Sequence, residues 1–131
     1  MGLKVVSAFI QKQGKVLIVR RALHKKRGGL WEFPGGKVEE GETPEEAIVR
    51  ELQEELNLIA KPKKIVAKVN YSYDDEDIEL SLIEVEWEGE PELREDAELS
   101  WVKLEDLDKI NLCEADRLFL HKLKFTNLKY K

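Results

Sequence analysis

The spacing of apolar and polar residues along the chain predicts several β-strands. Residues 3–10 and 15–20 are rich in Val, Ile and Phe and flank a short turn that contains Gly14, so we expect them to form a hairpin. Residues 64–73 and 78–87 alternate between apolar and polar side chains, which is typical of half-buried strands. These segments together predict a β-sheet.

Segments with Pro, Gly or acidic residues separate the predicted strands. Residues 61–63, Lys-Pro-Lys, interrupt the pattern before the third strand, and the acidic residues 74–77 form a turn after it. Residues 88–100 contain Gly, Pro and several acids, which predicts a loop. Trp101 and Val102 then resume a short strand.

Two other segments repeat their apolar residues at the period of an α-helix. The first begins at about Thr43, which forms a T-x-x-E capping box with Glu46 and places Pro44 at the first helical position. The second runs from about Cys113 to Lys124. Two helices combined with a sheet of several strands predict an α+β fold.

The first predicted helix has one apolar face and one acidic face. At about 100° per residue, Glu51, Glu54 and Glu55 share one face, whereas Ile48 and Leu52 lie on the other. Like charges at this spacing cost roughly 0.2 to 0.5 kcal/mol per pair unless cations neutralise them. A divalent metal would do so, and Mg²⁺ prefers oxygen ligands while keeping waters and substrate phosphates.

The distribution of charge limits the classes of ligand. A formal net charge of −5 argues against a general polyanion-binding surface. However, a basic stretch from Arg20 to Arg27 precedes the acidic helix, and an acidic stretch, residues 74–77, follows it. The basic stretch is a candidate phosphate-binding surface, and the alternative is a solvated loop.

Features of the whole chain predict one domain in a reducing compartment. The 131 residues suffice for one core without disulfides, and no apolar run approaches the roughly 20 residues that a membrane span needs. The lone Cys113 cannot form an internal disulfide, and residues 1–10 lack the apolar region of a signal peptide. We therefore expect a cytoplasmic protein, in which Cys113 is a small buried hydrophobic residue.

The segment from Gly35 to Leu58 resembles the Nudix box, G-x5-E-x7-R-E-U-x-E-E-x-G-U, in which U is aliphatic. The matching residues are Gly36, Glu42, Arg50, Glu51, Leu52, Glu54, Glu55 and Leu58. Asn57 stands where the family usually has glycine; since asparagine tolerates a left-handed conformation, we expect the helix to end there in that conformation. The flanking residues 30–37, LWEFPGGK, are similar to those of MutT-like nucleoside triphosphate pyrophosphohydrolases.

The resemblance spans nearly the whole chain and implies the Nudix α/β/α sandwich, a mixed β-sheet between helices, as a single domain over residues 1–131. It implies Mg²⁺-dependent hydrolysis of a nucleoside triphosphate to the monophosphate and pyrophosphate, with Mn²⁺ as a substitute metal. Modified nucleotides such as 8-oxo-dGTP are candidate substrates. The expected partner is a free nucleotide, not a nucleic acid polymer or a membrane, and the expected state is a monomer or homodimer.

Other functions remain open at this stage. Hydrolases of CTP or modified pyrimidines, of nucleotide sugars and of dinucleoside polyphosphates share the box. An alternative from another class is a nucleotide-binding module without catalysis. Such a module would be expected to have lost box glutamates, and this chain keeps them.

The resemblance also implies roles for individual residues. The implied metal ligands are the carbonyl of Gly36 and the carboxylates of Glu51, Glu54, Glu55 and Glu95, and the implied catalytic residues are Glu51, Glu54, Arg50 and Glu95. Glu98 is the nearest competitor of Glu95 for the acid of the later loop. Arg50 is implied to orient a neighbouring carboxylate, and Glu42 to support the loop and helix. Glu51 and Glu95 both remain candidate general bases.

The expected substrate contacts lie outside the acidic helix. Arg21 and Lys37 are the expected phosphate contacts, since charge-assisted hydrogen bonds to phosphate are strong; alternatively, Lys37 only balances the box acids. Phe33, like Trp31, is expected in the core or pocket wall. Asp116 stands where MutT has an asparagine that reads the base. An ionised Asp116 would select bases that present amino groups or protonated ring nitrogens, and its alternative role is a helix first-turn acid.

Overall fold

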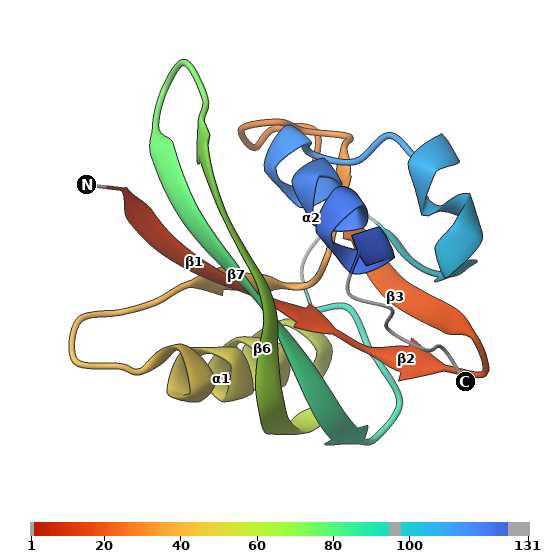
Figure 1. Cartoon of the computed structure of the whole chain (residues 1–131). Helices are drawn as coiled ribbons and strands as arrows, with labels where there is room; N and C mark the ends of the chain where they lie inside the picture. Colours follow the sequence, from red (N-terminus) through yellow and green to blue (C-terminus); the bar gives the residue numbers. More distant parts are fainter. Residues whose placement is uncertain (1, 95–97, 126–131) are drawn as a thin grey trace.

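The computed structural model describes residues 2–94 and 98–125, and their strands form two sheets (Figure 1). Sheet A has the order β5 (Gly35–Lys37), β1 (Leu3–Phe9), β7 (Asp77–Glu88) and β6 (Ile59–Ser72). Sheet B has the order β2 (Gln11–Lys12), β3 (Lys15–Arg20) and β4 (Trp31–Glu32), with β8 (Glu98–Lys103) paired to β3. Sheet A is mixed, because β1 runs parallel to β7 and antiparallel to β5.

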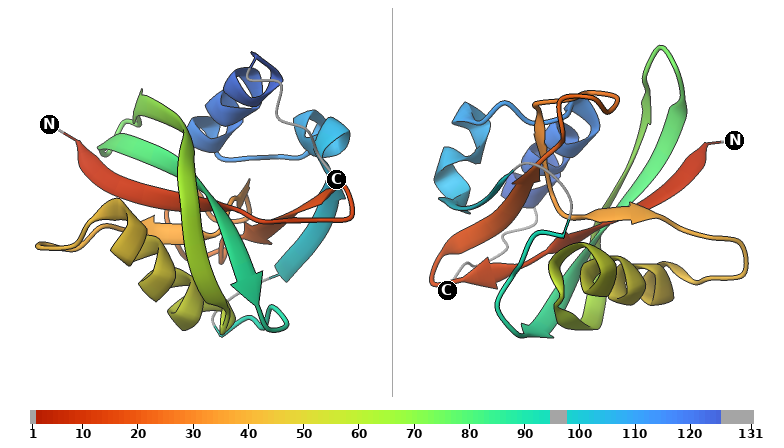
Figure 2. Two further views of the ribbon diagram at one scale, coloured as in Figure 1. Left: turned by 60° about the horizontal axis from the view of Figure 1, so that its bottom comes forward. Right: turned by 180° about the vertical axis from the view of Figure 1, so that it is seen from behind.

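Two α-helices cover opposite faces of sheet A (Figures 1 and 2). Successive side chains of a strand point to opposite faces, and in β7 Leu82 belongs to the core cluster of α2 (Glu114–Phe125), whereas Ile83 belongs to that of α1 (Pro44–Leu56). Both side chains are fully buried. The predicted α/β/α sandwich and both predicted helices are therefore confirmed. A 3-10 helix, η1 (Leu104–Lys109), was not predicted.

The predicted hairpin of residues 3–10 with 15–20 is wrong. β1 pairs with β5 and β7 in sheet A, and β3 instead forms the hairpin with the two-residue β2. The side chains of β1 are buried on both faces from Val6 to Phe9, as expected for a strand between two partners and two helices. Local alternation cannot distinguish this arrangement from a hairpin.

The predicted break at residues 61–63 is also wrong. β6 runs through Pro62 and pairs with β7 along its length, with register shifts between Pro62 and Lys64 and between Ile65 and Ala67. β6 is the edge strand of sheet A, where a proline at a bulge removes no required ladder hydrogen bond. The proline therefore bends the strand without ending it.

Both ends of α1 confirm the predicted capping. The backbone N–H of Glu46 donates to Thr43 Oγ1 at 3.1 Å, and that of Thr43 donates to Glu46 Oε1 at 2.9 Å. The helix ends at Asn57, which is left-handed with φ 56° and ψ 35°. Asn57 thus takes the place of the usual glycine without changing the path of the chain.

Substitutions of Asn57 should separate backbone strain from side-chain contacts. Asn57→Val is expected to lower the free energy of unfolding by roughly 1 kcal/mol or more, because a β-branched residue resists positive φ. Asn57→Gly should be neutral or stabilising, since the bonds from Arg94 and Gln53 to Asn57 Oδ1 are exposed. Thermal melts of both variants test this, and a valine variant as stable as the glycine variant would contradict it.

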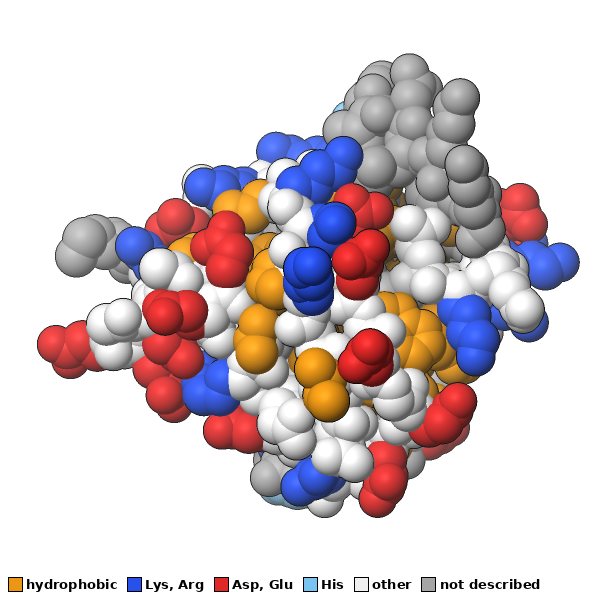
Figure 3. All heavy atoms as spheres, turned by 90° about the horizontal axis from the view of Figure 1, so that it is seen from below, with side chains coloured by type: hydrophobic (Ala, Val, Ile, Leu, Met, Phe, Trp, Pro, Cys, Tyr) orange, Lys and Arg blue, Asp and Glu red, His pale blue; other side chains and the backbone are white. Residues whose placement is uncertain are grey.

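The surface carries mixed charge in the view of Figure 3, where acidic and basic side chains are interspersed around scattered hydrophobic ones. Within the described residues, no helix is both long and apolar enough to cross a membrane. The fold thus presents charged side chains of both signs over much of the visible face.

Candidate active site

The turn between β5 and α1 brings the acidic helix face against the sheet. A Cβ atom at Gly36 would lie only 2.3 Å from the carboxyl carbon of Glu51, far closer than packing allows. A Cβ atom at Gly35 would likewise lie 2.0 Å from the carbonyl oxygen of Val6. The two glycines therefore let β5 pack against β1 while the Glu51 carboxylate lies against the β5 backbone.

Arg50 is the centre of the acidic site. Its Nε and Nη2 donate to the two oxygens of Glu42 at 2.7 and 2.9 Å, and its Nη2 also donates to the carbonyl of Lys37 at 2.9 Å. Its Nη1 donates to Glu51 at 2.9 Å and to Glu54 at 3.1 Å. One guanidinium thus holds the loop to the helix and contacts two of the box carboxylates.

Glu42 is held as an anion by these contacts. The Arg50 guanidinium and the backbone N–H of Glu39 lower the pKa of Glu42 to about 2. Both oxygens of Glu42 accept from Arg50, which joins the loop to the helix.

The box carboxylates, Glu51, Glu54 and Glu55, line a pocket of 140 Å³. The same pocket is lined by three cationic side chains, Arg20, Arg21 and Lys25. Acids that could bind a cation therefore face bases that could bind an anion. A pocket with both kinds of side chain suits a phosphate group together with a metal cation better than it suits a lone cation or a lone anion.

Glu55 is the residue that points most directly to a cation-binding site. Its Oε1 is buried and has no hydrogen-bond partner within the described part of the chain. Burial, with the nearby charges of Glu32 and Glu51, raises the pKa of Glu55 to about 8. A buried carboxylate oxygen without a donor is costly, and a hard divalent ion would compensate it, so the all-oxygen donor set fits Mg²⁺.

Burial also raises the pKa of Glu51, against the opposing effect of Arg50. Glu54 differs from both neighbours because its side chain is 61% exposed. The three carboxylates therefore differ in burial, although they lie on one helix face.

The predicted metal ligand Glu95 lies outside the described residues.

The competitor acid, Glu98, is engaged elsewhere. Its Oε1 accepts from Arg20 Nη1 at 2.8 Å across the β3–β8 pair. Arg20 Nε also donates to the carbonyl of Gly29 at 3.1 Å. Glu98 therefore acts in this structure as an anchor for an arginine that lines the acidic pocket.

A second pocket of 190 Å³ lies beside the first and shares Arg21 and Glu32 with it. Arg21 Nη1 donates to both oxygens of Glu32 at 3.1 Å, and its Nε donates to the carbonyl of Lys26 at 2.7 Å. The expected phosphate contact Lys37 also lines the second pocket. The Arg21–Glu32 ion pair is thus part of the wall common to both pockets.

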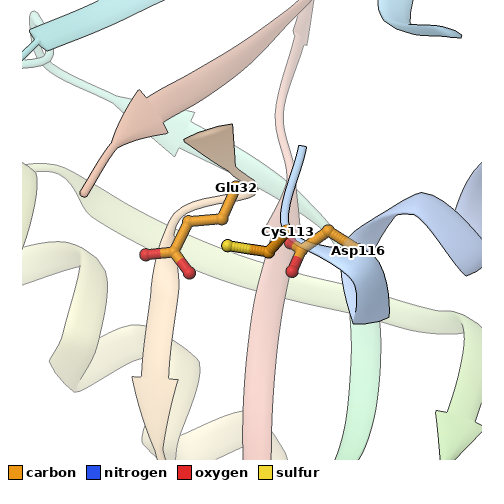
Figure 4. Close-up of side chains that lie close together, drawn as sticks. All are labelled: Glu32, Cys113 and Asp116. Atoms are coloured by element: carbon orange, nitrogen blue, oxygen red, sulfur yellow. The ribbon is translucent and has the colours of Figure 1, made fainter. Parts of the chain in front are cut away.

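Asp116 lies in the second pocket, at the start of α2. Its Oδ2 accepts from the backbone N–H of Phe33 at 3.0 Å, and the residue is 5% exposed. Potential ligand atoms of Asp116, Glu32 and Cys113 lie within 4.8 Å of one another (Figure 4). Burial, with the charge of Glu32, raises the pKa of Asp116 well above its ordinary value. The environment therefore favours the neutral carboxyl, not the ionised form expected from sequence.

Phe33 is a wall of this pocket, as predicted. Its ring packs between Phe9 and Phe119, with centroid separations of 6.4 and 5.9 Å. Arg20 and Arg27, which belong to the predicted basic stretch, also line the pockets, whereas sequence reasoning did not single out the lining residues Glu32 and Tyr73. Glu32 could have been noticed within the LWEFPGGK segment, whereas Tyr73 reads only as a strand residue.

Comparisons with known proteins agree with this geometry. A family model described as "NUDIX domain" matches residues 2–123. The chain belongs to the NUDIX domain family. It is 38% identical over 120 residues to the 8-oxo-dGTP diphosphatase of Escherichia coli (strain K12), covering 91% of this chain and 93% of that protein.

Two further proteins are similar to this chain over most of their length. The chain is 36% identical over 115 residues to the CTP pyrophosphohydrolase of Escherichia coli (strain K12), covering 87% of this chain and 85% of that protein. The crystal structure of the MutT protein from Methanosarcina mazei Go1 superposes with a TM-score of 0.88 at 28% identity, covering 97% and 96% of the two chains. The predicted Nudix, MutT-like resemblance is confirmed.

Proposed function

We propose that this NUDIX chain is a Mg²⁺-dependent nucleoside triphosphate pyrophosphohydrolase that releases a nucleoside monophosphate and pyrophosphate. The observation that carries the proposal is the buried Glu55 oxygen without a hydrogen-bond partner among the described residues, in a pocket lined by the three box carboxylates, by Glu32 and by three cationic side chains. Relatives named as an 8-oxo-dGTP diphosphatase and a CTP pyrophosphohydrolase support the same reaction class.

The box carboxylates would hold the metal, together with the carbonyl of Gly36 and with Glu95. A bound Mg²⁺, for which Mn²⁺ would substitute, neutralises phosphate oxygens and lowers the pKa of a coordinated water. Arg50 keeps Glu51 and Glu54 in place through Nη1. Glu51 is a candidate general base, because burial raises its pKa towards the range in which a carboxylate can take a proton.

The cationic side chains of the first pocket would bind the polyphosphate. Arg21 already lies between the two pockets, so a phosphate could compete with Glu32 for its guanidinium. Arg20 adds a second guanidinium, fixed by Glu98 and by the carbonyl of Gly29. Lys37, on the second pocket, remains a candidate for the same role.

The second pocket would bind the base, and Asp116 would read its edge. A neutral carboxyl presents one O–H donor and one carbonyl acceptor, whereas an ionised one only accepts. It would therefore pair with bases that place a donor beside an acceptor, as 8-oxoguanine and cytosine both do. The proposed substrates are accordingly 8-oxo-dGTP-like and CTP-like nucleotides, hydrolysed as free nucleotides by a cytoplasmic monomer or homodimer.

Substitutions of Asp116 test which protonation state reads the base. Asp116→Asn is expected to keep the base preference, because asparagine also offers one donor and one acceptor. Asp116→Ala should change the ratio of kcat/KM between purine and pyrimidine triphosphates by roughly tenfold or more. The measurement is kcat/KM for 8-oxo-dGTP, dGTP and CTP. An asparagine variant that behaves like the alanine variant would show that the ionised form reads the base.

A substrate panel tests the proposed function as a whole. Turnover of 8-oxo-dGTP, dGTP, CTP, ADP-ribose and a dinucleoside polyphosphate is measured in Mg²⁺ and in excess chelator. The proposal predicts that a triphosphate gives the highest kcat/KM and that chelator abolishes turnover. A preference for ADP-ribose, or binding of triphosphates without turnover, would contradict it.

A further inference from the structure

An ion-pair clasp joins two loops that are distant in the sequence. Arg27 lies in the loop between β3 and β4, and its Nη1 and Nη2 donate to Asp75 at 3.2 Å and to Glu76 at 2.6 Å in the β6–β7 turn. The Arg27 guanidinium also lies 3.9 Å from the ring centroid of Tyr73. Figure 1 shows this turn projecting beyond the rest of the sheet, so the clasp holds it by its tip.

The clasp is built into the fold and is not a chance surface contact. The Arg27 side chain is only 16% exposed, and its backbone is left-handed with φ 56°, a conformation that non-glycine residues rarely adopt. The next residue, Gly28, has no space for a side chain, because a Cβ atom would lie 2.4 Å from the carbonyl oxygen of Leu23. The backbone of Arg27 is thus held in an unfavourable conformation, in which its guanidinium lies over the ring of Tyr73.

The clasp also forms part of the second pocket. Arg27, Tyr73 and Glu76 line the same pocket as Asp116. The hydroxyl of Tyr73 accepts from the backbone N–H of Ala115 at 2.9 Å, so the clasp reaches the first turn of α2 beside Asp116. A continuous set of contacts thus runs from the basic loop through the acidic turn to Ala115, the neighbour of Asp116.

We propose that Arg27 is a positioning residue for base recognition, which fixes Tyr73 and the β6–β7 turn as the outer wall of the base pocket. The proposal rests on the proposed function only in taking the second pocket as the base site. Arg27 is not part of the lining of the first pocket, where the box carboxylates lie. It therefore acts on nucleotide affinity and not on the hydrolytic step.

Lys26 is a matched control in the same loop. It carries the same charge and faces the same acids, with its Nζ 3.3 Å from Asp75 and 3.7 Å from Glu76. However, its side chain is 60% exposed, and solvent-exposed ion pairs contribute little. Arginine in addition offers a planar group that stacks on an aromatic ring, which lysine does not. The loss of Arg27, and not the loss of one positive charge from the loop, should thus weaken nucleotide binding.

The experiment compares the full chain with Arg27→Ala, Arg27→Lys, Glu76→Gln and Lys26→Ala. KM and kcat are measured with CTP and dGTP in Mg²⁺, and Kd is measured for CMP and dGMP by calorimetry. Arg27→Ala is expected to raise KM and the monophosphate Kd by roughly tenfold, with kcat within about twofold of the unsubstituted chain. Arg27→Lys and Glu76→Gln should give smaller increases, and Lys26→Ala should change neither constant by more than about twofold.

The outcomes separate this proposal from its alternatives. A purely structural Arg27 would lower the melting temperature of Arg27→Ala while leaving KM and Kd unchanged, which would overturn the proposal. A loss of kcat at constant KM would overturn it as well. If Arg27→Ala does not fold, Glu76→Gln decides by the same constants. Failure of the proposed function is a different result, in which the unsubstituted chain binds monophosphates but does not hydrolyse triphosphates.

Discussion

Glu54→Gln is expected to lower kcat by about two orders of magnitude or more while leaving the fold intact. The substitution keeps the shape of the side chain and removes the negative charge that would neutralise a metal ion. The Glu54 side chain is 61% exposed and accepts a hydrogen bond from Arg50 Nη1, so little stability depends on it. The measurement is kcat in saturating Mg²⁺, with the melting temperature measured in parallel.

Glu45→Gln provides the control for this substitution. Glu45 is an exposed acid in the first turn of the same helix and does not line the acidic pocket. Its loss should leave kcat within about twofold, since it changes only the overall charge. If Glu54→Gln retained full activity, or if both variants lost it equally, the carboxylate would not be acting at a metal site.

The second large effect is on stability: Glu55→Gln should stabilise the metal-free protein at alkaline pH. Burial raises the pKa of Glu55 from 4.5 to about 8, so the folded protein holds a proton that the unfolded chain releases. The stability that this proton provides is complete below pH 4.5 and is lost as the pH rises through 8. At pH 9 the ionised Glu55 should therefore destabilise the folded protein by roughly 3 to 5 kcal/mol, and glutamine removes this penalty.

Urea unfolding at pH 5 and pH 9 in excess chelator measures this effect. The difference in free energy of unfolding between Glu55→Gln and the unsubstituted chain should be small at pH 5 and favour glutamine at pH 9. Mg²⁺ at pH 9 should stabilise the unsubstituted chain more than the variant, because a ligand stabilises the state that binds it. A difference that is independent of pH would show that Glu55 does not titrate in this range.

The same residue would thus limit stability and support function. A buried carboxylate oxygen without a hydrogen-bond partner, such as Oε1 of Glu55 among the described residues, is unfavourable, and a bound cation would compensate it. Arg50 donates hydrogen bonds to Glu51 and Glu54, which reduces the repulsion between them, whereas the hydrogen bonds of Arg50 within the described residues do not include Glu55. The uncompensated negative charge therefore lies at Glu55, where a bound metal ion would neutralise it.

The sequence alone predicted the acidic helix well, because its determinants are local. The capping box at Thr43 and Glu46 and the left-handed end at Asn57 depend on residues within a few positions of each other, and all are confirmed. The face that carries the box carboxylates follows from helical periodicity. The α/β/α arrangement came only from the family resemblance, since periodicity does not specify which strands pair.

Long-range contacts account for what could not be predicted. The parallel pairing of β1 with β7 joins residues more than 70 positions apart, and alternation of apolar residues suggested a hairpin instead. The role of Arg27 depends on Asp75 and Glu76, which are brought to it only by the folded hairpin. The raised pKa of Asp116 likewise depends on its burial beside Glu32, which its position in a helix does not reveal.

The identity of the released phosphate tests the central proposal most directly. ³¹P NMR of the products from CTP or 8-oxo-dGTP, in Mg²⁺ and in excess chelator, distinguishes pyrophosphate from orthophosphate. The proposal predicts pyrophosphate and the nucleoside monophosphate in equal amounts, and no products in chelator. Orthophosphate and a nucleoside diphosphate, or turnover that persists in chelator, would contradict it.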